Sequence, residues 1–252
     1  MNRSKTSKLR LDELLMARGL ADSLAMAKAM ILAGEVLVNE QKAEKCGARV
    51  AEDSKLRLLI KPAPFVSRAG IKLDRALSHF GMDVAGKICL DIGASTGGFT
   101  DCLLQRGAAK VFAADAGTNQ LDWKLRRDSR VMSLEKTNAR YLELATLGSR
   151  AQVVTMDVSF ISATVILPTL PALLEPQADV VVLVKPQFEV RREQVEHGGL
   201  VTDPRLHREA VTRVSEKLLE LGFGGLASVE SVLPGASGNH EYFVHAIWRK
   251  AD

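Results

Sequence analysis

A glycine-rich turn joins an apolar segment to an amphipathic one in the stretch 87–106 (K-I-C-L-D-I-G-A-S-T-G-G-F-T-D-C-L-L-Q-R), and it constrains the fold more than any other feature. Ile88–Ile92 has the short apolar pattern of a buried strand, and apolar residues recur at helical spacing from about Gly97. Asp91 lies near the carboxyl end of this strand, and Gly93 lets a ligand approach the backbone closely. The stretch predicts a parallel α/β sheet with a ligand at the carboxyl end of its first strand.

The spacing of the turn residues narrows the class of ligand. The pattern D-x-G-x-S-x-G-G differs from the G-x-G-x-x-G of dinucleotide-binding enzymes. It resembles the first motif of S-adenosylmethionine (SAM) methyltransferases, in which backbone groups and small side chains hold the amino acid end of the cofactor. An ordinary strand, turn and helix without a cofactor is the alternative. The resemblance implies cofactor contacts from Asp91, Gly93, Ala94, Ser95, Thr96, Gly97, Gly98 and Phe99.

Two polar residues that follow the next strands extend the predicted cofactor site. The predicted strand Lys110–Ala114 ends at Asp115, at the sequence distance from Asp91 where an acidic residue binds ribose hydroxyls. A turn aspartate before Gly117 is the alternative for this residue. Asn138 follows a third predicted strand, where related enzymes line the adenine side of the pocket. A plain polar loop fits this position almost equally well.

The rest of the chain continues the alternation of strands and helices. Asp179–Val184 is a valine-rich run typical of a strand buried on both faces. Ser159–Ser162 is expected to open a helix, and 187–202 is expected to form a loop over the pocket. We therefore expect the α/β fold of class I SAM-dependent methyltransferases: a Rossmann-like, mostly parallel seven-stranded sheet with a terminal antiparallel hairpin. Further strands are expected at Val131–Leu134, Val153–Met156, Gly225–Val232 and Tyr242–Trp248, and a helix at Pro204–Leu221.

The first quarter of the chain predicts a separate small basic unit. Residues up to Lys61 carry the whole net charge of +4, and the remainder carries equal numbers of both signs. Apolar residues at helical spacing, followed by the alternating segment 35–40, predict two helices and a hairpin. Such a basic unit beside a neutral one predicts a polyanionic partner. A solvated basic face without a partner is the alternative.

Two segments of this unit resemble the RNA-binding module first named for ribosomal protein S-four. They are R-L-D-E-L-L-M-A-R-G-L-A-D-S from Arg10 and A-K-A-M-I-L-A-G-E-V-L-V-N from Ala27. Leu24 departs from the arginine that family members often carry there. The prolines of Lys61–Val66 predict an extended linker, so we expect an RNA-binding domain at 1–60, a linker at 61–66 and the methyltransferase domain at 67–252. The resemblance implies phosphate contacts from Arg10, Arg18, Lys28, Lys42 and Lys45, and we add Arg68.

Four ionisable residues lie at predicted element ends that face one edge of the sheet. Their motifs are V-S-R-A-G-I-K-L, M-D-V-S-F-I-S, V-K-P-Q-F-E and S-G-N-H-E-Y-F. With the glycine turn, these motifs resemble the TlyA family, a branch of the FtsJ-like RNA 2′-O-methyltransferases. The resemblance implies methyl transfer to the ribose 2′-hydroxyl of cytidine in ribosomal RNA, the large subunit being favoured over the small one. It also implies a catalytic set of Lys72, Asp157, Lys185 and Glu241.

The chemistry of a ribose hydroxyl explains these residue types. This hydroxyl is a poor nucleophile that must be aligned with the methyl group and lose its proton. Lys185 can accept the proton if it is partly neutral, with Lys72 as a second cation and the two carboxylates fixing both lysines. Alternatively, Lys185 only orients the hydroxyl, since alignment by itself contributes several kcal/mol. Singly, each residue also fits a surface lysine, a helix cap, a strand end or a turn.

Other features exclude several classes of protein. The three cysteines and five histidines show no disulfide or metal-ligand spacing. The start, Met1–Arg10, does not fit a secretory signal, and the longest apolar stretch, Phe160–Leu174, is broken by two prolines. We therefore expect a cytoplasmic protein without a metal or a membrane anchor, its oligomeric state being left open. The alternatives to an enzyme are a hemolysin, the name that this family has historically carried, and a non-catalytic RNA-binding factor of ribosome assembly.

Overall fold

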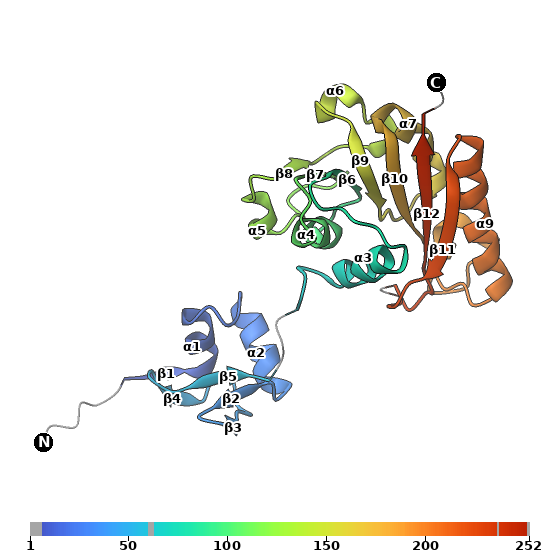
Figure 1. Ribbon diagram of the computed structural model, residues 1–252. Coiled ribbons are helices and arrows are strands. Elements are labelled where there is room, and N and C mark those ends of the chain that lie inside the picture. Colours follow the sequence, from blue (N-terminus) through green and yellow to red (C-terminus); the bar gives the residue numbers. More distant parts are fainter. Residues whose placement is uncertain (1–6, 60–62, 236, 251–252) are drawn as a thin grey trace, which may run out of the picture. The chain divides into compact units, whose positions relative to one another are not determined.

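The structure is a computed structural model that describes residues 7–59, 63–235 and 237–250. The chain divides into two compact units, residues 1–63 and 64–252 (Figure 1). The predicted linker, 61–66, spans this division. Lys61 and Pro62 lie outside the described residues, whereas Pro64–Val66 belong to the second unit, in which Val66 N donates to Asp101 Oδ2 at 2.8 Å.

Two helices and short antiparallel strands build the described part of the first unit. Helices α1 (Leu11–Ala17) and α2 (Leu24–Leu32) bury their apolar faces in one small core. Ser23 caps α2 by accepting a hydrogen bond from Met26 N at 3.2 Å. Left-handed residues at 39 and 40 make the tight turn between the hairpin strands. Strand β1 (Lys8–Arg10) pairs with β4 (Arg49–Ala51), and β2 (Val36–Val38) pairs with β3 (Gln41–Lys42) and β5 (Leu56–Leu58).

The described part of the second unit is organised around one seven-stranded sheet in the order β11-β12-β10-β9-β6-β7-β8. Strands β6 to β10 are parallel, and β12 runs antiparallel between β10 and β11. This confirms the predicted mostly parallel sheet with a terminal antiparallel hairpin. The strands are β6 (Ile88–Ile92), β7 (Lys110–Ala114), β8 (Val131–Leu134), β9 (Ala151–Met156), β10 (Leu174–Val184), β11 (Gly224–Glu230) and β12 (Tyr242–Arg249).

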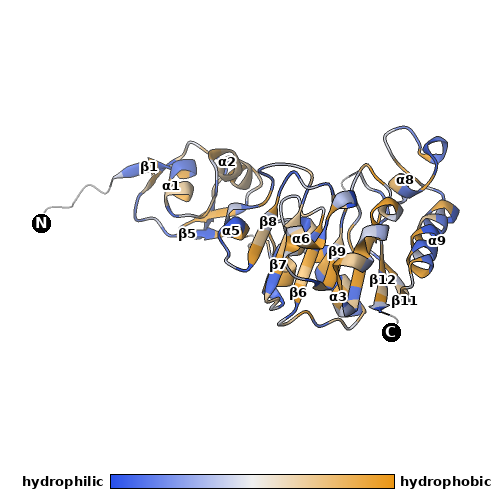
Figure 2. Cartoon of the chain, turned by 90° about the horizontal axis from the view of Figure 1, so that it is seen from above, coloured by the Kyte–Doolittle hydropathy of each residue, from blue (hydrophilic) through white to orange (hydrophobic). Residues whose placement is uncertain are grey.

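Helices cover both faces of the sheet and bury two apolar clusters against it. Helices α3 (Arg68–His79) and α4 (Gly98–Gln105) share one cluster, and α7 (Leu170–Leu173) and α9 (Pro204–Glu220) share the other. Figure 2 shows the hydrophobic colour concentrated on the strands between these layers. None of the described helices is long and apolar enough to span a bilayer. The remaining helices are α5 (Trp123–Arg126), α6 (Leu144–Leu147) and α8 (Pro186–Glu189), with 3₁₀ turns at Ala139–Tyr141, Ala163–Val165, Leu167–Thr169 and Arg192–Gln194.

The segment after β9 differs from the sequence prediction. Ser159–Ser162 opens no helix, because Phe160 has a left-handed φ of +65°. Two 3₁₀ turns follow instead of a regular helix, and Pro168 supplies no N–H for one. The predicted loop 187–202 is also partly ordered, since it contains most of α8 and a 3₁₀ turn. Both segments lie at the edge of the sheet where the parallel strands end.

Candidate active site

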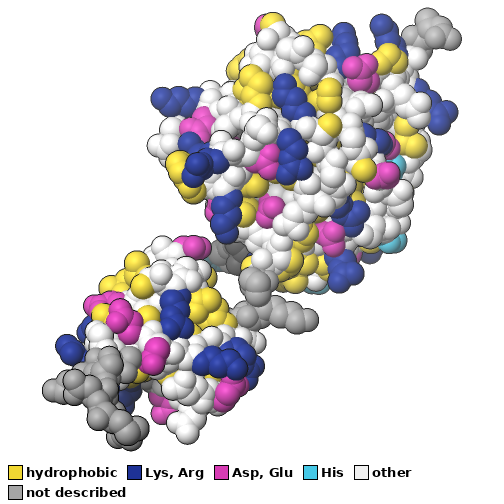
Figure 3. Space-filling view, turned by 60° about the vertical axis from the view of Figure 1, so that its left-hand side comes forward, with side chains coloured by type: hydrophobic (Ala, Val, Ile, Leu, Met, Phe, Trp, Pro, Cys, Tyr) yellow, Lys and Arg dark blue, Asp and Glu magenta, His cyan; other side chains and the backbone are white. Residues whose placement is uncertain are grey.

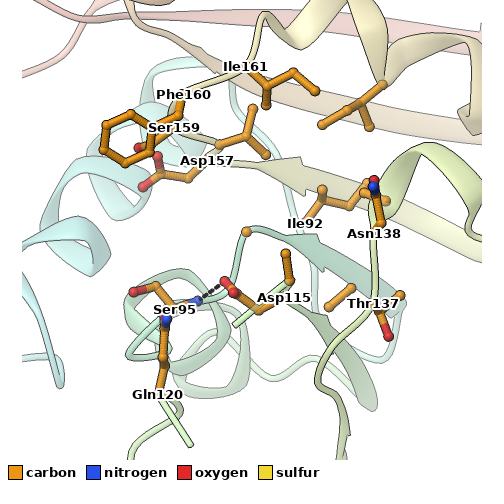
Figure 4. Close-up of a pocket in the computed structure, with 16 residues that line it drawn as sticks. Ile92, Ser95, Asp115, Gln120, Thr137, Asn138, Asp157, Ser159, Phe160 and Ile161 are labelled. Carbon is orange, nitrogen blue, oxygen red and sulfur yellow. Dashed lines mark hydrogen bonds between the residues drawn. The ribbon is translucent and has the colours of Figure 1, made fainter. Parts of the chain in front are cut away.

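A cavity of about 480 Å³ opens at the carboxyl ends of β6, β7, β8 and β9. In Figure 4, Asp115 lies in the cavity wall beside Ser95, with Asp157, Ser159 and Phe160 on one side and Asn138 on another. The parallel strands bring these residues together because their carboxyl ends meet at one edge. Four of the predicted cofactor residues line this cavity: Gly93, Ser95, Asp115 and Asn138.

Gly93 is held where the turn after β6 meets the loop after β9. Its φ is +83°, and a Cβ atom there would lie 2.2 Å from the carbonyl oxygen of Asp157. The N–H groups of Gly93 and Ala94 both donate to Ala114 O, at 2.8 and 3.2 Å. The turn therefore draws the ends of three strands together, and only glycine fits at its closest approach.

The carboxylate of Asp115 closes the cavity on the β7 side. Its Oδ2 accepts a hydrogen bond from Ser95 N at 2.8 Å, and its Oδ1 accepts one from Gly117 N at 2.7 Å. Ser95 has a left-handed φ of +47°, which directs its N–H toward this carboxylate. Each carboxylate oxygen keeps further acceptor capacity. Asp115 can therefore accept hydrogen bonds from a ribose diol while it fixes the turn.

Asp91 lies beneath the turn rather than in the cavity wall. It is fully buried, and it accepts hydrogen bonds from Thr100 Oγ1 at 2.7 Å and Thr155 Oγ1 at 3.1 Å. Burial raises the pKa of Asp91 to about 7. The other predicted cofactor residues outside the cavity wall occupy the turn and the first turn of α4: Ala94, Thr96, Gly97, Gly98 and Phe99.

Each lysine of the predicted catalytic set contacts one carboxylate of that set. Lys72 Nζ donates to Glu241 Oε2 at 2.6 Å, and the two side chains are only 10% and 3% exposed. Lys185 Nζ lies 2.7 Å from Asp157 Oδ1, at an angle that makes the contact an ion pair without a hydrogen bond. This Nζ donates instead to Ser159 Oγ at 2.8 Å. Each ammonium group therefore faces one carboxylate at ion-pair distance.

The register of the strands places the two ion pairs at the same edge of the sheet. Val184, the last residue of β10, pairs with Tyr242, the first residue of β12. Lys185 and Glu241 are the next residues along these two strands, and Asp157 directly follows β9, the other neighbour of β10. Lys72 reaches Glu241 from α3. Four residues that are far apart in the sequence thus lie at one edge of the sheet, where Asp157 lines the cavity.

A second set of contacts, between α8 and the loop after β9, escaped the sequence analysis. Phe160 is 92% exposed at the cavity rim, and its ring lies 5.4 Å from that of Phe188. Glu189 is buried and accepts hydrogen bonds from Ser162 Oγ and, at 2.7 Å, from Ala163 N. Burial raises the pKa of Glu189. The contacting residues lie in two motifs quoted in the sequence analysis, V-K-P-Q-F-E and M-D-V-S-F-I-S. The motifs themselves were therefore the signal that could have found these contacts.

The predicted RNA-binding residues divide into two kinds. Arg10 donates to Asp12 at 2.7 and 3.0 Å and lowers the pKa of that carboxyl, and Arg18 donates to Ser54 O at 2.7 Å and to Glu52 O. The side chains of these two arginines therefore bind groups of the first unit itself and stabilise it. Among the described residues, Lys28, Lys42, Lys45 and Arg68 form no ion pair. Figure 3 shows Lys and Arg side chains spread over the visible face of both units.

Among the described residues, the cysteines form no disulfide and the histidines form no metal site. Cys46, Cys89 and Cys102 are free, and burial raises the pKa of Cys89 and of Cys102 to about 12. Within residues 7–59, 63–235 and 237–250, no three His, Cys, Asp or Glu side chains gather as a metal site needs.

The chain matches two known families and several named relatives. The FtsJ-like methyltransferase family matches residues 65–248, and the S4 domain matches residues 9–54. "16S/23S rRNA (cytidine-2'-O)-methyltransferase TlyA" of Mycobacterium tuberculosis is 47% identical over 236 residues, which cover 93% of this chain and 88% of that protein. "Hemolysin A" of Brachyspira hyodysenteriae is 42% identical over 240 residues, which cover 95% of this chain and 100% of that protein.

A solved structure that matches nearly the whole chain is also similar. It is a provisionally named hemolysin from Streptococcus thermophilus, which is 39% identical and superposes with a TM-score of 0.74. The match covers 98% of this chain and 90% of that one. By its sequence, its sheet order and its glycine turn, the chain belongs to the FtsJ-like methyltransferase family, in the TlyA branch that carries an S4 domain.

Proposed function

We propose that this protein transfers a methyl group from SAM to the ribose 2′-hydroxyl of a cytidine in ribosomal RNA. The observation that carries the proposal is the pair of lysine–carboxylate contacts, Lys72–Glu241 and Lys185–Asp157, at the sheet edge beside the cavity. The relative from Mycobacterium tuberculosis, which is named for this activity, supports the nucleotide and the position of transfer. Such a protein works in the cytoplasm, where its ribosomal substrate is found.

The residues around the cavity fit SAM. The volume lies within the range of small-molecule sites, roughly 300–1,000 Å³. Gly93 lines the cavity without a side chain, Asp115 offers acceptors for ribose hydroxyls, and Asn138 offers a polar edge for the adenine. Bound SAM supplies an electrophilic methyl group on a sulfonium sulfur. Gly93, Ser95, Asp115 and Asn138 are the residues that would hold it.

We assign the alignment of the ribose 2′-hydroxyl, and the stabilisation of its developing charge, to the two lysines. We place the ribose 2′-oxygen beside Lys185, whose ammonium group donates a hydrogen bond to it and holds it in line. Because Asp157 and Glu241 each hold one lysine in place, Lys185 acts by orientation and Lys72 by stabilising the negative charge that develops on the oxygen. The hydroxyl proton leaves late in the step, to a water molecule, because an aligned oxygen needs no strong base.

The exposed ring of Phe160 supplies a platform for the target base. A left-handed backbone carries this aromatic side chain out to 92% exposure at the cavity rim, where Phe188 supports it. RNA-modifying proteins commonly stack an unpaired base on such a ring. The S4 domain contributes affinity for RNA phosphates. The chain thus holds a cofactor cavity, a polar reaction centre and an aromatic surface for the base.

Labelled methyl transfer tests this proposal. The protein is incubated with methyl-labelled SAM and separated ribosomal subunits, and the modified ribose is mapped. We expect label on the 2′-oxygen of a cytidine, with the large subunit preferred. Lys185→Ala keeps its SAM affinity in calorimetry and loses at least ~100-fold in transfer rate, whereas Lys250→Ala, which removes an exposed cation at the opposite end of β12, keeps full activity. Full activity of Lys185→Ala would overturn the assignment of the reaction centre.

A membrane-lysing function is the second candidate, because the relative from Brachyspira hyodysenteriae is named Hemolysin A. The test is red-cell lysis by the purified protein without SAM, run beside Lys185→Ala. Lysis that persists in this variant would support the hemolysin. RNA binding without methyl transfer by the unchanged protein would instead indicate a non-catalytic assembly factor.

A further inference from the structure

A second hollow, of about 310 Å³, adjoins the Lys72–Glu241 ion pair. Helix α3 forms one wall of it, and the carboxyl end of β11 with the residues that follow forms the other. In Figure 1, α3 lies beside the end of β11 and the start of β12. Lys72 lines this hollow but not the cofactor cavity. The charged and polar residues of the hollow are Lys72, Arg75, Ser78, His79, Glu230 and Ser231.

The wall formed by α3 presents the guanidinium group of Arg75 and the imidazole ring of His79 to the hollow. Lys72, Arg75 and His79 are three and four residues apart, so they follow one face of the helix. Glu241 neutralises Lys72. Arg75 and His79 are exposed, and within the described residues neither has an ion-pair or hydrogen-bond partner. On the opposite wall, Glu230 is already engaged, since His240 Nδ1 lies 2.5 Å from its Oε1.

We propose that this hollow holds the nucleotide next to the methylated one, with Arg75 and His79 contacting its phosphate. The inference rests on the proposed function. In RNA the 2′-hydroxyl stands on the carbon beside the one that carries the 3′-phosphate, so a ribose held at the lysine pair must send its phosphate to an adjoining surface. The hollow beside Lys72 is such a surface, and its volume suits one nucleotide.

The chemistry of the hollow fits a phosphodiester. A guanidinium group forms paired, charge-assisted hydrogen bonds with phosphate oxygens, and an imidazole adds a donor. Val232, which is 58% exposed on the opposite wall, offers an apolar contact to the sugar or base of the same nucleotide. The contact to a phosphate carries no sequence information, so it serves alignment of the RNA rather than choice of the cytidine.

Kinetics and salt dependence test the inference in the full-length protein. We compare Arg75→Ala, His79→Ala, the double variant and Arg75→Lys with Lys250→Ala as the matched surface cation. In the double variant the KM for RNA rises roughly tenfold, as for the loss of a charge-assisted contact, whereas kcat and SAM affinity stay near the unchanged protein's. Arg75→Ala also lowers the slope of log affinity against log salt by about 0.7. Arg75→Lys restores part of the affinity.

Several outcomes would overturn it. An unchanged KM and salt slope in the double variant would remove the phosphate contact, and a fall in kcat alone would place the effect on the Lys72–Glu241 pair instead. If the unchanged protein transfers no methyl group, the proposed function fails, and filter binding of RNA still decides this contact. RNA affinity that is equal in Arg75→Ala and Lys250→Ala would then reject it. Melting curves confirm that each variant is folded.

Discussion

Asp91 places an ionisable group where no water reaches it. It is fully buried beneath the glycine turn, and burial raises its pKa to about 7 from the ordinary 3.8. Between these two values the unfolded chain carries a carboxylate there, while the folded protein carries a carboxylic acid. The folded state binds more protons, so the free energy of unfolding falls as pH rises through this range, by up to roughly 4 kcal/mol.

Asp91→Asn tests this dependence. The amide is neutral at every pH, so the stability of the variant relative to the unchanged protein should rise between pH 5 and pH 8. Thermal melts at both pH values measure the difference. Glu143→Gln, which removes an exposed carboxylate at the start of α6, is the control and should show no such trend. A constant difference between Asp91→Asn and the unchanged protein would show that Asp91 is ionised in the folded state.

The sequence motif indicated the sheet edge at which its residues lie better than it indicated their individual contacts. Gly93 and Ser95 of the glycine pattern line one cavity together with Asp115, because a turn at the end of a buried strand must lie at the sheet edge. Their contacts with a cofactor stay a prediction. The pattern did not separate residues that face the cavity from those that support the turn, such as Asp91 and Phe99. That distinction depends on Thr155 and other partners from strands far along the chain.

Among the elements, the turn between β6 and α4 depends on Gly93. In Gly93→Ala, the new methyl group would lie 2.2 Å from Asp157 O, at a residue with φ of +83°. Gly148→Ala is a matched control, because Gly148 has φ of +75° and its new methyl group would have no neighbouring atom within 4 Å. We expect Gly148→Ala to cost about 1–2 kcal/mol of stability from backbone strain alone, and Gly93→Ala to cost clearly more.

Denaturant unfolding and SAM calorimetry measure both variants. Gly93→Ala should also lose SAM affinity, since the displaced loop carries Asp157 at the cavity wall. Gly148→Ala should bind SAM normally. Equal stability losses in the two variants would mean that the approach of the two loops does not constrain the turn.

The bounds of some strands could be predicted from the local sequence pattern alone, whereas the conformation of one loop could not. Strands Ile88–Ile92, Lys110–Ala114 and Val131–Leu134 have the predicted bounds, because each is an apolar run ended by a polar or glycine residue. The segment after β9 was predicted wrongly as a helix. Its conformation depends on Glu189, which reaches it from α8 and takes up Ser162 Oγ and Ala163 N. A contact of this kind leaves no periodicity in the sequence.

For the molecule as a whole, we predict that the two units contribute separately to SAM binding and to RNA affinity. Each apolar cluster of the second unit lies within residues 64–252, and the first unit has its own core. The chain 64–252 should therefore fold, bind SAM with unchanged affinity and bind RNA more weakly. The loss should exceed tenfold at low salt and shrink as salt rises, since phosphate contacts are screened.

Filter binding across a salt series, with SAM calorimetry on the same samples, measures both affinities. The full-length variant Lys42→Glu/Lys45→Glu is the companion, because it keeps both cores and reverses two exposed charges. It should weaken RNA binding in the same direction. RNA affinity of chain 64–252 equal to that of the full chain would contradict the role of the S4 domain.

The contact between Lys72 and Glu241 joins residues 169 positions apart, and the second of them comes directly before the last strand. During translation, the glycine turn, Lys72 and Lys185 are therefore synthesised before Glu241, the partner of Lys72. The nascent chain lacks β12, and with it the strand between β10 and β11. The Lys72–Glu241 contact and the complete seven-stranded sheet can therefore form only after residues 241–249 have left the ribosome.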